Sequence, residues 1–340
     1  MWIGGYLLLS LEELVLNVDR CDIKVPTSAL FSSLTVLNLS GIKFISGPTN
    51  KSGNVQLDFP VLRTYKTDDC TWSSSLKCVT LEAPLLKVVS IKDFRRRSAS
   101  NNSYTVLKFC ASSLAEFTYN GYLLPDTIVF DLSAAHIASA NIDVDIYEEE
   151  ISVQEMVALS SKLLKQFQNV EYLKFGMSGE EVLQLTKDSL ADLPTFKMLS
   201  HLELANVTAE ISLALLLKTP YLKTLIFQVR LAKDSLTDLP SFEMLSHLEL
   251  GNVTGEILLA LLFKTLNLKT LIFHELLVDQ ELLNYDCEPH CFLNLQVVKF
   301  LSFDGSEHEL SFAKFVMENA LFLKRMTFIP TWKLRKSNLE

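Results

Sequence analysis

The sequence contains one long internal duplication. Residues 188–227 read DSLADLPTFKMLSHLELANVTAEISLALLLKTPYLKTLIF, and residues 234–273 read DSLTDLPSFEMLSHLELGNVTGEILLALLFKTLNLKTLIF. Nine of these 40 aligned positions differ, and the copies are offset by 46 residues. Self-similarity at a fixed period is typical of repeat architectures, in which each unit packs only against its neighbours. The duplication therefore predicts a fold made of stacked units.

Each copy contains a shorter pattern, L-x-x-L-x-L, that recurs every 23 residues. It begins at Leu199, Leu222, Leu245 and Leu268, so the duplication equals two units of 23. This period lies within the range of about 20–29 residues used by leucine-rich repeats. The three apolar residues are expected to turn inward from a short strand that pairs in parallel with its neighbours. We therefore predict an α/β fold, a leucine-rich-repeat solenoid whose parallel strands line the concave side of a right-handed βα horseshoe.

The pattern continues on both sides of the duplication. Further units begin at Leu11, Leu34, Leu62, Leu76, Leu86, Leu114, Ile137, Val170, Leu295 and Leu323. The units at 62, 76 and 86 are separated by gaps of only 14 and 10 residues, which cannot hold a strand, a return segment and two turns. Either one of these three is not a repeat strand, or residues have been lost near 71–75.

The segments that return the chain between strands are predicted to be partly helical. Residues 210–218 and 256–264 contain strong helix formers, and Thr208 and Thr254 precede them as candidate N-caps. Residues 152–167 form the longest helix candidate, with apolar residues along one side. We expect these helices on the outer side of the horseshoe.

Composition narrows the class of protein. A hydrophobic content of 49% argues against disorder, and a net charge of −9 gives no general attraction to nucleic acid or anionic membranes. No apolar run reaches the length of a membrane span, and the apolar N-terminus lacks the basic region and cleavage site of a signal peptide. The six cysteines have no framework spacing. We predict reduced thiols in a cytoplasmic or nuclear protein.

The polar positions between the pattern leucines are the candidate binding residues. In the duplicated region they are His201, Glu203, Thr224, Ile226, His247, Glu249, Thr270 and Ile272. On the concave side these residues would contact a protein partner or a small ligand. Two alternatives stay open: strand positions that face water are polar for that reason alone, and the recurring His/Glu pair is inherited from the duplication.

Other motifs give no specific chemistry. Cys287, His290 and Cys291 lie close together, but zinc needs four ligands and the sequence offers no second pair, so no metal and no cofactor are expected. The basic run Arg95–Arg97 is interpreted as a solvated loop. An enzyme would need clustered His, Ser and Asp side chains, and no nucleophile, phosphate-binding or dinucleotide signature occurs. We therefore predict a protein that is not an enzyme.

Longer motifs resemble a known family. The P-x-F-x-x-L-x-H-L-E-L stretch from Pro194, the Leu11–Asn17 and Leu34–Gly41 repeats, and the tail motifs Cys291–Phe300 and Phe312–Ala320 resemble plant F-box/leucine-rich-repeat proteins that end in an FBD domain. The resemblance implies a repeat solenoid over residues 1–280 and an FBD-like cap over residues 281–340.

The resemblance also implies a role and partners. Such proteins select targets for a cullin-type ubiquitin ligase, so a protein target on the concave face is expected, with no nucleic acid and no membrane. Family members begin with an F-box that docks on a Skp-type adaptor, and no such pattern precedes Leu11, which argues against adaptor binding by this chain. The alternative is a truncated decoy, or an incomplete gene product, that binds a target without delivering it for ubiquitination.

Overall fold

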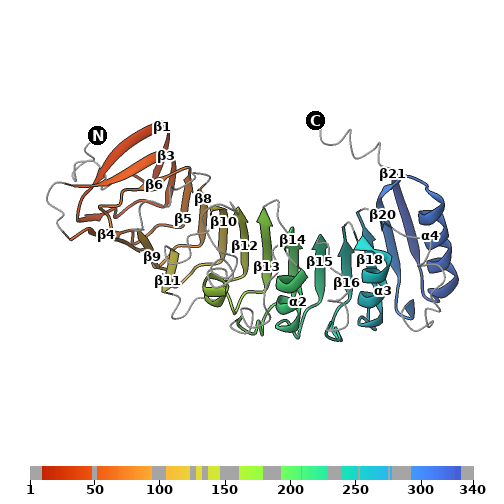
Figure 1. Ribbon diagram of the computed structural model, residues 1–340. Coiled ribbons are helices and arrows are strands. Elements are labelled where there is room, and N and C mark those ends of the chain that lie inside the picture. Colours follow the sequence, from red (N-terminus) through yellow and green to blue (C-terminus); the bar gives the residue numbers. More distant parts are fainter. Residues whose placement is uncertain are drawn as a thin grey trace. The chain divides into compact units, whose positions relative to one another are not determined.

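The protein folds as a parallel-sheet repeat solenoid with few helices (Figure 1). The computed structural model describes residues 10–47, 52–93, 105–122, 128–131, 137–145, 161–178, 193–207, 209–228, 239–251, 253–274, 276–277 and 292–330. The chain divides into two compact units. Unit 1 comprises residues 1–171 and 177–181, and unit 2 comprises residues 172–176 and 182–340.

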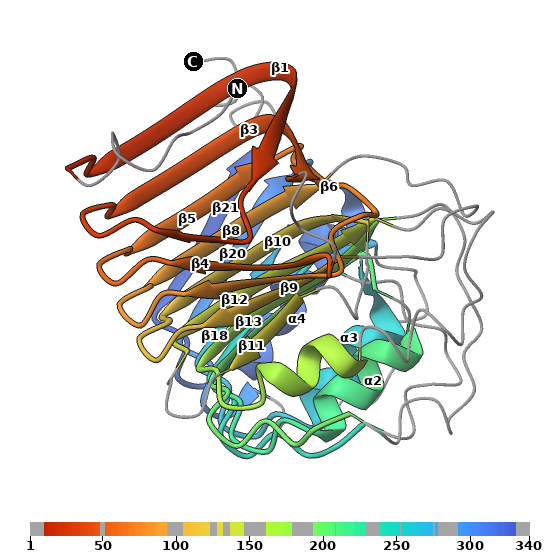
Figure 2. The same ribbon diagram turned by 90° about the vertical axis from the view of Figure 1, so that its left-hand side faces the viewer.

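Unit 1 contains two parallel sheets (Figure 2). Its main sheet consists, in spatial order, of β1 (Glu13–Val25), β3 (Val36–Ser46), β5 (Thr64–Asp68), β8 (Val88–Asp93), β10 (Glu116–Tyr122) and β12 (Ser139–Asp145). The short β6 (Thr71–Trp72) also pairs with β3. Its second sheet consists of β11 (Ile128–Asp131), β9 (Val106–Cys110), β7 (Cys78–Glu82), β4 (Asn54–Asp58) and β2 (Ser28–Leu30).

Aromatic side chains join the two sheets of unit 1. The Tyr65 ring from β5 lies edge-on to Phe109 from β9, with ring centroids 5.3 Å apart. Phe117 from β10 meets Phe130 from β11 in the same way at 5.1 Å. All four rings are buried. Apolar faces of two sheets thus supply the core, which one strand or one sheet is unable to bury alone.

The second sheet corrects the prediction of helical returns for unit 1. Between the main strands from β3 to β12, each described return up to residue 131 contains a strand. These segments, such as Cys78–Glu82, alternate apolar and polar residues at a period of two, which is the pattern of a strand. The gaps around Leu76 are explained by the same arrangement. The repeat that begins at Leu76 forms β7, which pairs with β4 and β9 instead of joining β5 and β8 in the main sheet.

Unit 2 has one main parallel sheet. In spatial order its strands are β13 (Tyr172–Ser178), β14 (His201–Ala205), β15 (Thr224–Gln228), β16 (His247–Leu250), β18 (Thr270–Phe273), β20 (Val297–Phe303) and β21 (Arg325–Pro330). Two further short strands, β17 (Val253–Thr254) and β19 (Leu276–Leu277), pair with each other. The expected side-by-side parallel strands are confirmed here in both copies of the duplication.

Helices form the described returns of unit 2. They are α2 (Ala209–Leu217), α3 (Gly255–Phe263) and α4 (Glu307–Asn319). The helices predicted at 210–218 and 256–264 are confirmed as α2 and α3. Of the longest helix candidate, in unit 1, residues 161–166 are helical and residues 152–160 lie outside the described residues. Thr208 lies outside them too, and Thr254 ends β17.

Packing in unit 2 follows the leucine pattern. Each strand from β14 to β18 begins two residues after the first leucine of its unit, and the following pattern residues, such as Leu202 and Leu204, are fully buried. Helix α4 packs on this buried side, where Phe312 lies edge-on to Phe273 with ring centroids 5.5 Å apart. Outward and inward residues alternate along each strand, so one side of the sheet carries the apolar core. No helix in the described ranges is long and apolar enough to cross a bilayer.

Helix α4 begins with a side-chain cap. Ser306 is the N-cap, and its hydroxyl accepts a hydrogen bond from the Glu309 backbone N–H at 3.3 Å. The buried Glu309 carboxylate accepts from the backbone N–H groups of Asp304 and Gly305 at 3.0 and 2.9 Å. The Ser306 bond satisfies a backbone donor that the helix N-terminus leaves unpaired, and the Glu309 bonds hold the two residues that precede the cap.

Replacing Ser306 with alanine is expected to lower the free energy of unfolding by about 1 kcal/mol, because the Glu309 N–H loses its acceptor. Urea unfolding followed by far-ultraviolet circular dichroism measures the change. The control is Ser311→Ala within α4, where alanine is the better helix former and no loss is expected. Equal losses in both variants would contradict the capping role.

Candidate functional site

Two rows of side chains lie on the side of the unit 2 sheet opposite its buried core; we call them the sheet face. In strand order from β13 to β21 the first row is Tyr172, His201, Thr224, His247, Thr270, Val297 and Arg325. The second row is Lys174, Glu203, Ile226, Glu249, Ile272, Lys299 and Thr327. The structure thus brings the eight sequence-predicted positions together, at the centre of both rows.

Exposure differs among these eight positions. His201 is exposed, whereas Glu203, Thr224, Ile226, His247, Glu249 and Thr270 are half-buried. Ile272 is only 7% exposed, because its neighbours on the face cover it. The sheet face is therefore a mixed surface, with aliphatic residues between polar ones. Whether these residues bind a partner stays a prediction.

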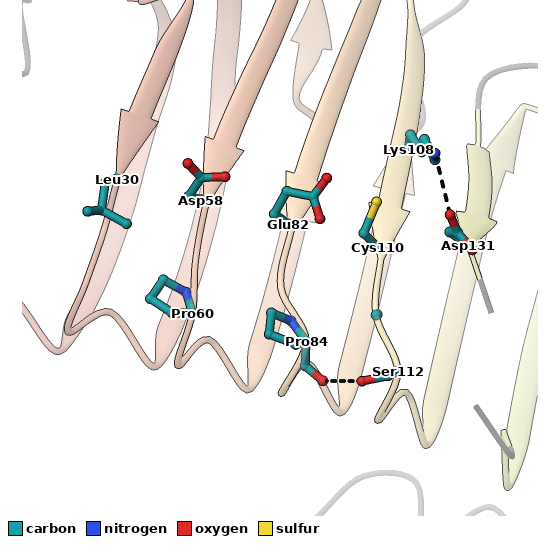
Figure 3. A pocket seen from close by; sticks show the side chains of 10 residues that line it. Leu30, Asp58, Pro60, Glu82, Pro84, Lys108, Cys110, Ser112 and Asp131 are labelled. Atoms are coloured by element: carbon teal, nitrogen blue, oxygen red, sulfur yellow. Dashed lines mark hydrogen bonds and ion pairs between the residues drawn. The ribbon is translucent and has the colours of Figure 1, made fainter. Parts of the chain in front are cut away.

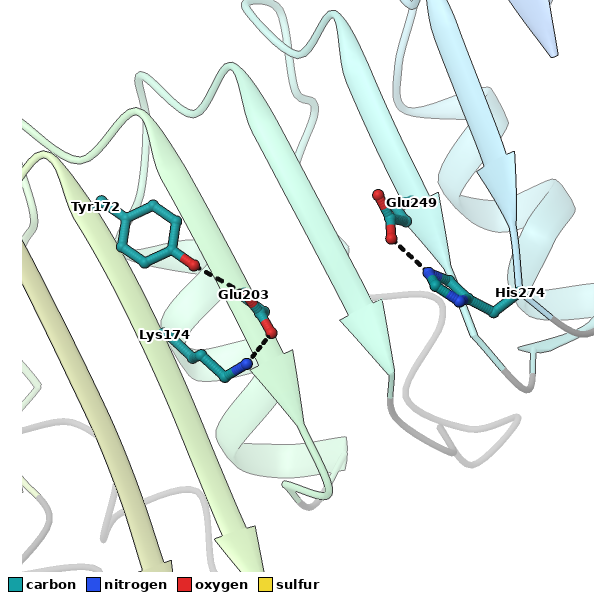
Figure 4. A network of polar contacts seen from close by, with 5 residues as sticks. All are labelled: Tyr172, Lys174, Glu203, Glu249 and His274. Atoms are coloured by element: carbon teal, nitrogen blue, oxygen red, sulfur yellow. Dashed lines mark hydrogen bonds and ion pairs between the residues drawn. The ribbon is translucent and has the colours of Figure 1, made fainter. Parts of the chain in front are cut away.

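Glu203 is held by two side chains of the neighbouring strand β13 (Figure 4). The Tyr172 hydroxyl donates a hydrogen bond to Glu203 Oε2 at 2.8 Å, and Lys174 Nζ forms an ion pair with Glu203 Oε1. Burial raises the pKa of Tyr172 to about 12, and the Glu203 carboxylate adds to the effect. Tyr172, Lys174 and Glu203 thus form a cluster in which each side chain has a partner. These contacts fix the three side chains on the sheet face, and the Glu203 carboxylate is not free.

Glu249, the equivalent residue in the second copy, has different partners. Its carboxylate contacts His274 Nε2, just beyond β18, and lies 3.8 Å from His247 Nε2 (Figure 4). Burial lowers the pKa of His247, although Glu249 acts in the opposite direction. In the first copy His201 instead bonds Ser200, with Nδ1 and Oγ 2.8 Å apart. The recurring His/Glu pair therefore makes two different sets of contacts.

Sequence reasoning missed three members of these clusters. Tyr172 and Lys174 occupy, in the unit beginning at Val170, the same pattern positions as His201 and Glu203, so extending the pattern by one unit would have found them. His274 follows the last pattern residue, Phe273, and carries no signal of its own. Its contact with Glu249 depends on the pairing of β16 and β18.

The charge of Glu203 is expected to add to the effect of burial on the pKa of Tyr172. Glu203→Gln removes the anion that opposes tyrosinate formation, so the pKa of Tyr172 should fall from about 12 towards its ordinary value of 10.0. The absorbance of tyrosinate during an alkaline titration measures it, with Tyr172→Phe identifying the step. The duplication supplies the matched control Glu249→Gln, which should leave the step in place. An unchanged step in Glu203→Gln would show that burial alone sets this pKa.

Unit 1 carries a depression of about 680 Å³ on its second sheet (Figure 3). Asp58, Glu82, Cys110 and Asp131 lie in register across four neighbouring strands at its floor. Lys108 Nζ lies 3.5 Å from Asp131 Oδ2, and burial together with Glu82 raises the pKa of the Cys110 thiol to about 11. This thiol stays protonated at neutral pH and is therefore a poor nucleophile.

The other sequence motifs add no described site. Residues 287–291 and Arg95–Arg97 lie outside the described residues, and the described part of the chain holds no cluster of three potential metal ligands. Unit 1 also has an apolar pocket of about 340 Å³, lined chiefly by Leu and aromatic side chains of its two sheets. The boundary at residue 280 between the repeat solenoid and the FBD-like cap stays a prediction.

A known protein family matches the last part of the chain. The sequence model of the FBD family matches residues 286–328. Within the described residues this segment holds β20, α4 and β21 up to Phe328, a single strand–helix–strand coil of unit 2. No curated protein sequence matches the chain. The match covers a small part of the chain, and it includes Val297, Lys299, Arg325 and Thr327 of the sheet face.

Proposed function

We propose that this chain is a non-catalytic protein-interaction scaffold related to the target-recognition part of F-box ubiquitin-ligase subunits. The FBD match over residues 286–328 supports the relation, since FBD domains are typically found in F-box proteins. The repeat solenoid, built on a leucine pattern of period 23, is in keeping with leucine-rich repeats. The target binds to the sheet face of unit 2.

The observation that carries this proposal is the in-register sheet face. Seven parallel strands present two straight rows of side chains, and solenoid proteins use extended surfaces of this kind to bind other proteins. Aliphatic Ile226 and Ile272 alternate with polar residues along the second row.

A double substitution on the sheet face tests the proposal. Thr224→Arg with Ile226→Arg adds bulk and charge at two half-buried positions of β15, and in-cell crosslinking followed by mass spectrometry compares it with the unaltered chain. A bound target should decrease by about tenfold or more, as for residues at the centre of an interface. Val129→Arg, exposed on the second sheet of unit 1, is the control. A target captured equally by all three chains would place binding elsewhere.

The relation to ubiquitin ligases needs a separate measurement. Once a target is known, its lifetime is compared in cells with and without the chain. Faster decay supports delivery for ubiquitination, whereas slower decay supports the decoy. A pull-down with a Skp-type adaptor completes the comparison, because a decoy does not bind the adaptor.

A further inference from the structure

Four cations gather at the β18–β20–β21 side of the sheet face. Lys299 points outward from β20, and Arg325 is the first residue of β21. Lys269 and Lys324 immediately precede β18 and β21. We call Lys269, Lys299, Lys324 and Arg325 the basic patch. Three of the four, all except Lys269, lie in the segment that matches the FBD family.

Carboxylates on the sheet face do not neutralise the basic patch. Glu203 is paired with Lys174, and Glu249 with His274, both towards the β13 side of the patch. The outward positions of β18, β20 and β21 in the two rows hold no acidic residue. Among the described residues, no acidic side chain forms an ion pair with the patch. A chain with a net charge of −9 thus presents a locally positive surface here.

Burial and one hydrogen bond constrain two cations of the basic patch. Lys299 is half-buried, and its charge is near enough to contribute to the lowered pKa of His247. Lys324 Nζ donates a hydrogen bond to Gln296 Oε1 at 3.1 Å, which holds its ammonium group over β20. Arg325 is exposed. A partly buried cation interacts with an incoming anion more strongly than a fully solvated one.

Aliphatic side chains continue from the basic patch along the second row. Ile272 lies beside Lys299, and Ile226 lies two strands further on. Neighbouring strands are about 4.8 Å apart, so a chain crossing them would pass from Lys299 to Ile226 over three strand spacings, about 14 Å. Such a chain would place an aliphatic group at the half-buried Ile226, and carboxylates at Lys299 and Arg325.

We propose that the basic patch binds an acidic segment of the target protein, in which aliphatic residues are followed by carboxylates. This inference rests on the proposed function and names the chemistry of the bound segment. The Arg325 guanidinium accepts a carboxylate in a bidentate geometry, and Lys299 binds a second one as a point charge. The attraction also steers association, so it weakens as salt screens the charges.

A nucleic acid is the other anion that would fit a basic surface. The sheet face favours a peptide, because its second row interposes aliphatic residues, whereas single-stranded nucleic acid is bound on aromatic side chains on which bases stack. Tyr172, at the far strand β13, is the one Phe, Tyr or Trp residue in the two rows, and its hydroxyl is bonded to Glu203.

Fluorescence anisotropy with defined probes tests this inference on the full chain. The probes are a labelled peptide in which isoleucines are followed by glutamates, its glutamine counterpart, and single-stranded DNA of similar charge. The acidic peptide should bind at least about tenfold more tightly than the glutamine peptide at low salt, and the difference should shrink at about 0.15 M salt. Lys299→Glu with Arg325→Glu should raise the dissociation constant of the acidic peptide by about tenfold or more.

The control is Lys314→Glu on α4, an exposed lysine 3.9 Å from Glu318 and outside the sheet face. Its affinity for the acidic peptide should be unchanged, and circular dichroism checks that each variant is folded. Lys299→Gln with Arg325→Gln repeats the test without reversing charge. Equal binding of the acidic and glutamine peptides, or tighter binding of DNA, would overturn the proposal.

The two proposals fail differently. If the Thr224/Ile226 variant loses its crosslinked target while the Lys299/Arg325 variant keeps it, the sheet face binds a target but not through an acidic segment. If neither variant loses the target, the sheet face is not the interface at all.

Discussion

Phe300→Ala is expected to lower the free energy of unfolding of unit 2 by about 3–5 kcal/mol, the range for removing a large buried aromatic side chain. Phe300 is 1% exposed and contacts four other rings. It stacks on Phe273 and Phe328, with centroids 5.3 and 5.1 Å away, and lies edge-on to Phe303 at 6.0 Å and to Phe312 at 6.4 Å. Its removal opens a cavity across three elements, β18, β21 and α4, which are unable to collapse together.

Hydrogen exchange measured by mass spectrometry follows this loss within unit 2, because a repeat array responds mainly near the altered coil. Phe322→Ala serves as the control, since that ring sits in a turn and is 60% exposed. A loss in Phe300→Ala no larger than in Phe322→Ala would mean that the aromatic cluster does not hold β20, β21 and α4 together.

The second large effect is expected at Gly121 in β10. Its φ of +146° is rarely adopted by other residues, and an added Cβ would lie 2.0 Å from the backbone oxygen of Asp93 on β8. Gly121→Ala must therefore break the β8–β10 pairing at this point or displace a strand that has neighbours on both sides. We expect a loss of at least about 3 kcal/mol, since backbone strain alone costs about 1–3 kcal/mol.

Urea unfolding followed by circular dichroism measures this loss, with Gly251→Ala as the matched control. The nearest atom to a Cβ at Gly251 is the side-chain Cγ of Gln228 at 3.2 Å, which is able to move aside. The control should lose much less. Similar losses in both variants would show that β8 and β10 accommodate the methyl group by shifting.

The main strands were predictable because the constant spacing of the leucine pattern also determines which residues pair between neighbouring strands. In the duplicated copies, a spacing of 23 residues brings His201, Thr224, His247 and Thr270 opposite one another, as the pairing confirms. The return strands of unit 1 were not predicted, since Leu76 begins the same L-x-x-L-x-L pattern as the main strands. An alternation of apolar and polar residues predicts a strand with one buried side. Both sheets of unit 1 contain such strands, so the alternation did not indicate to which sheet a strand belongs.

The candidate face was predictable in position but not in its contacts. Outward positions follow from the period of two along each strand, which is why the eight named residues share one side of the sheet. The partners of Glu203 and Glu249 depend on which side chains the adjacent strands supply, and the two copies are flanked differently. Near-identical sequence in the two copies therefore gave no warning that one glutamate meets a lysine and the other a histidine.

Strands β14 and β16 occupy equivalent positions in the two copies, and this affects how the number of strands changes when the gene recombines. Unequal crossing-over between the segments that encode residues 188–227 and 234–273 would add or delete two strands at once. Every remaining strand would still meet a neighbour at the same height. The width of the sheet that a bound partner can contact would therefore change in steps of about 10 Å, twice the distance between neighbouring strands.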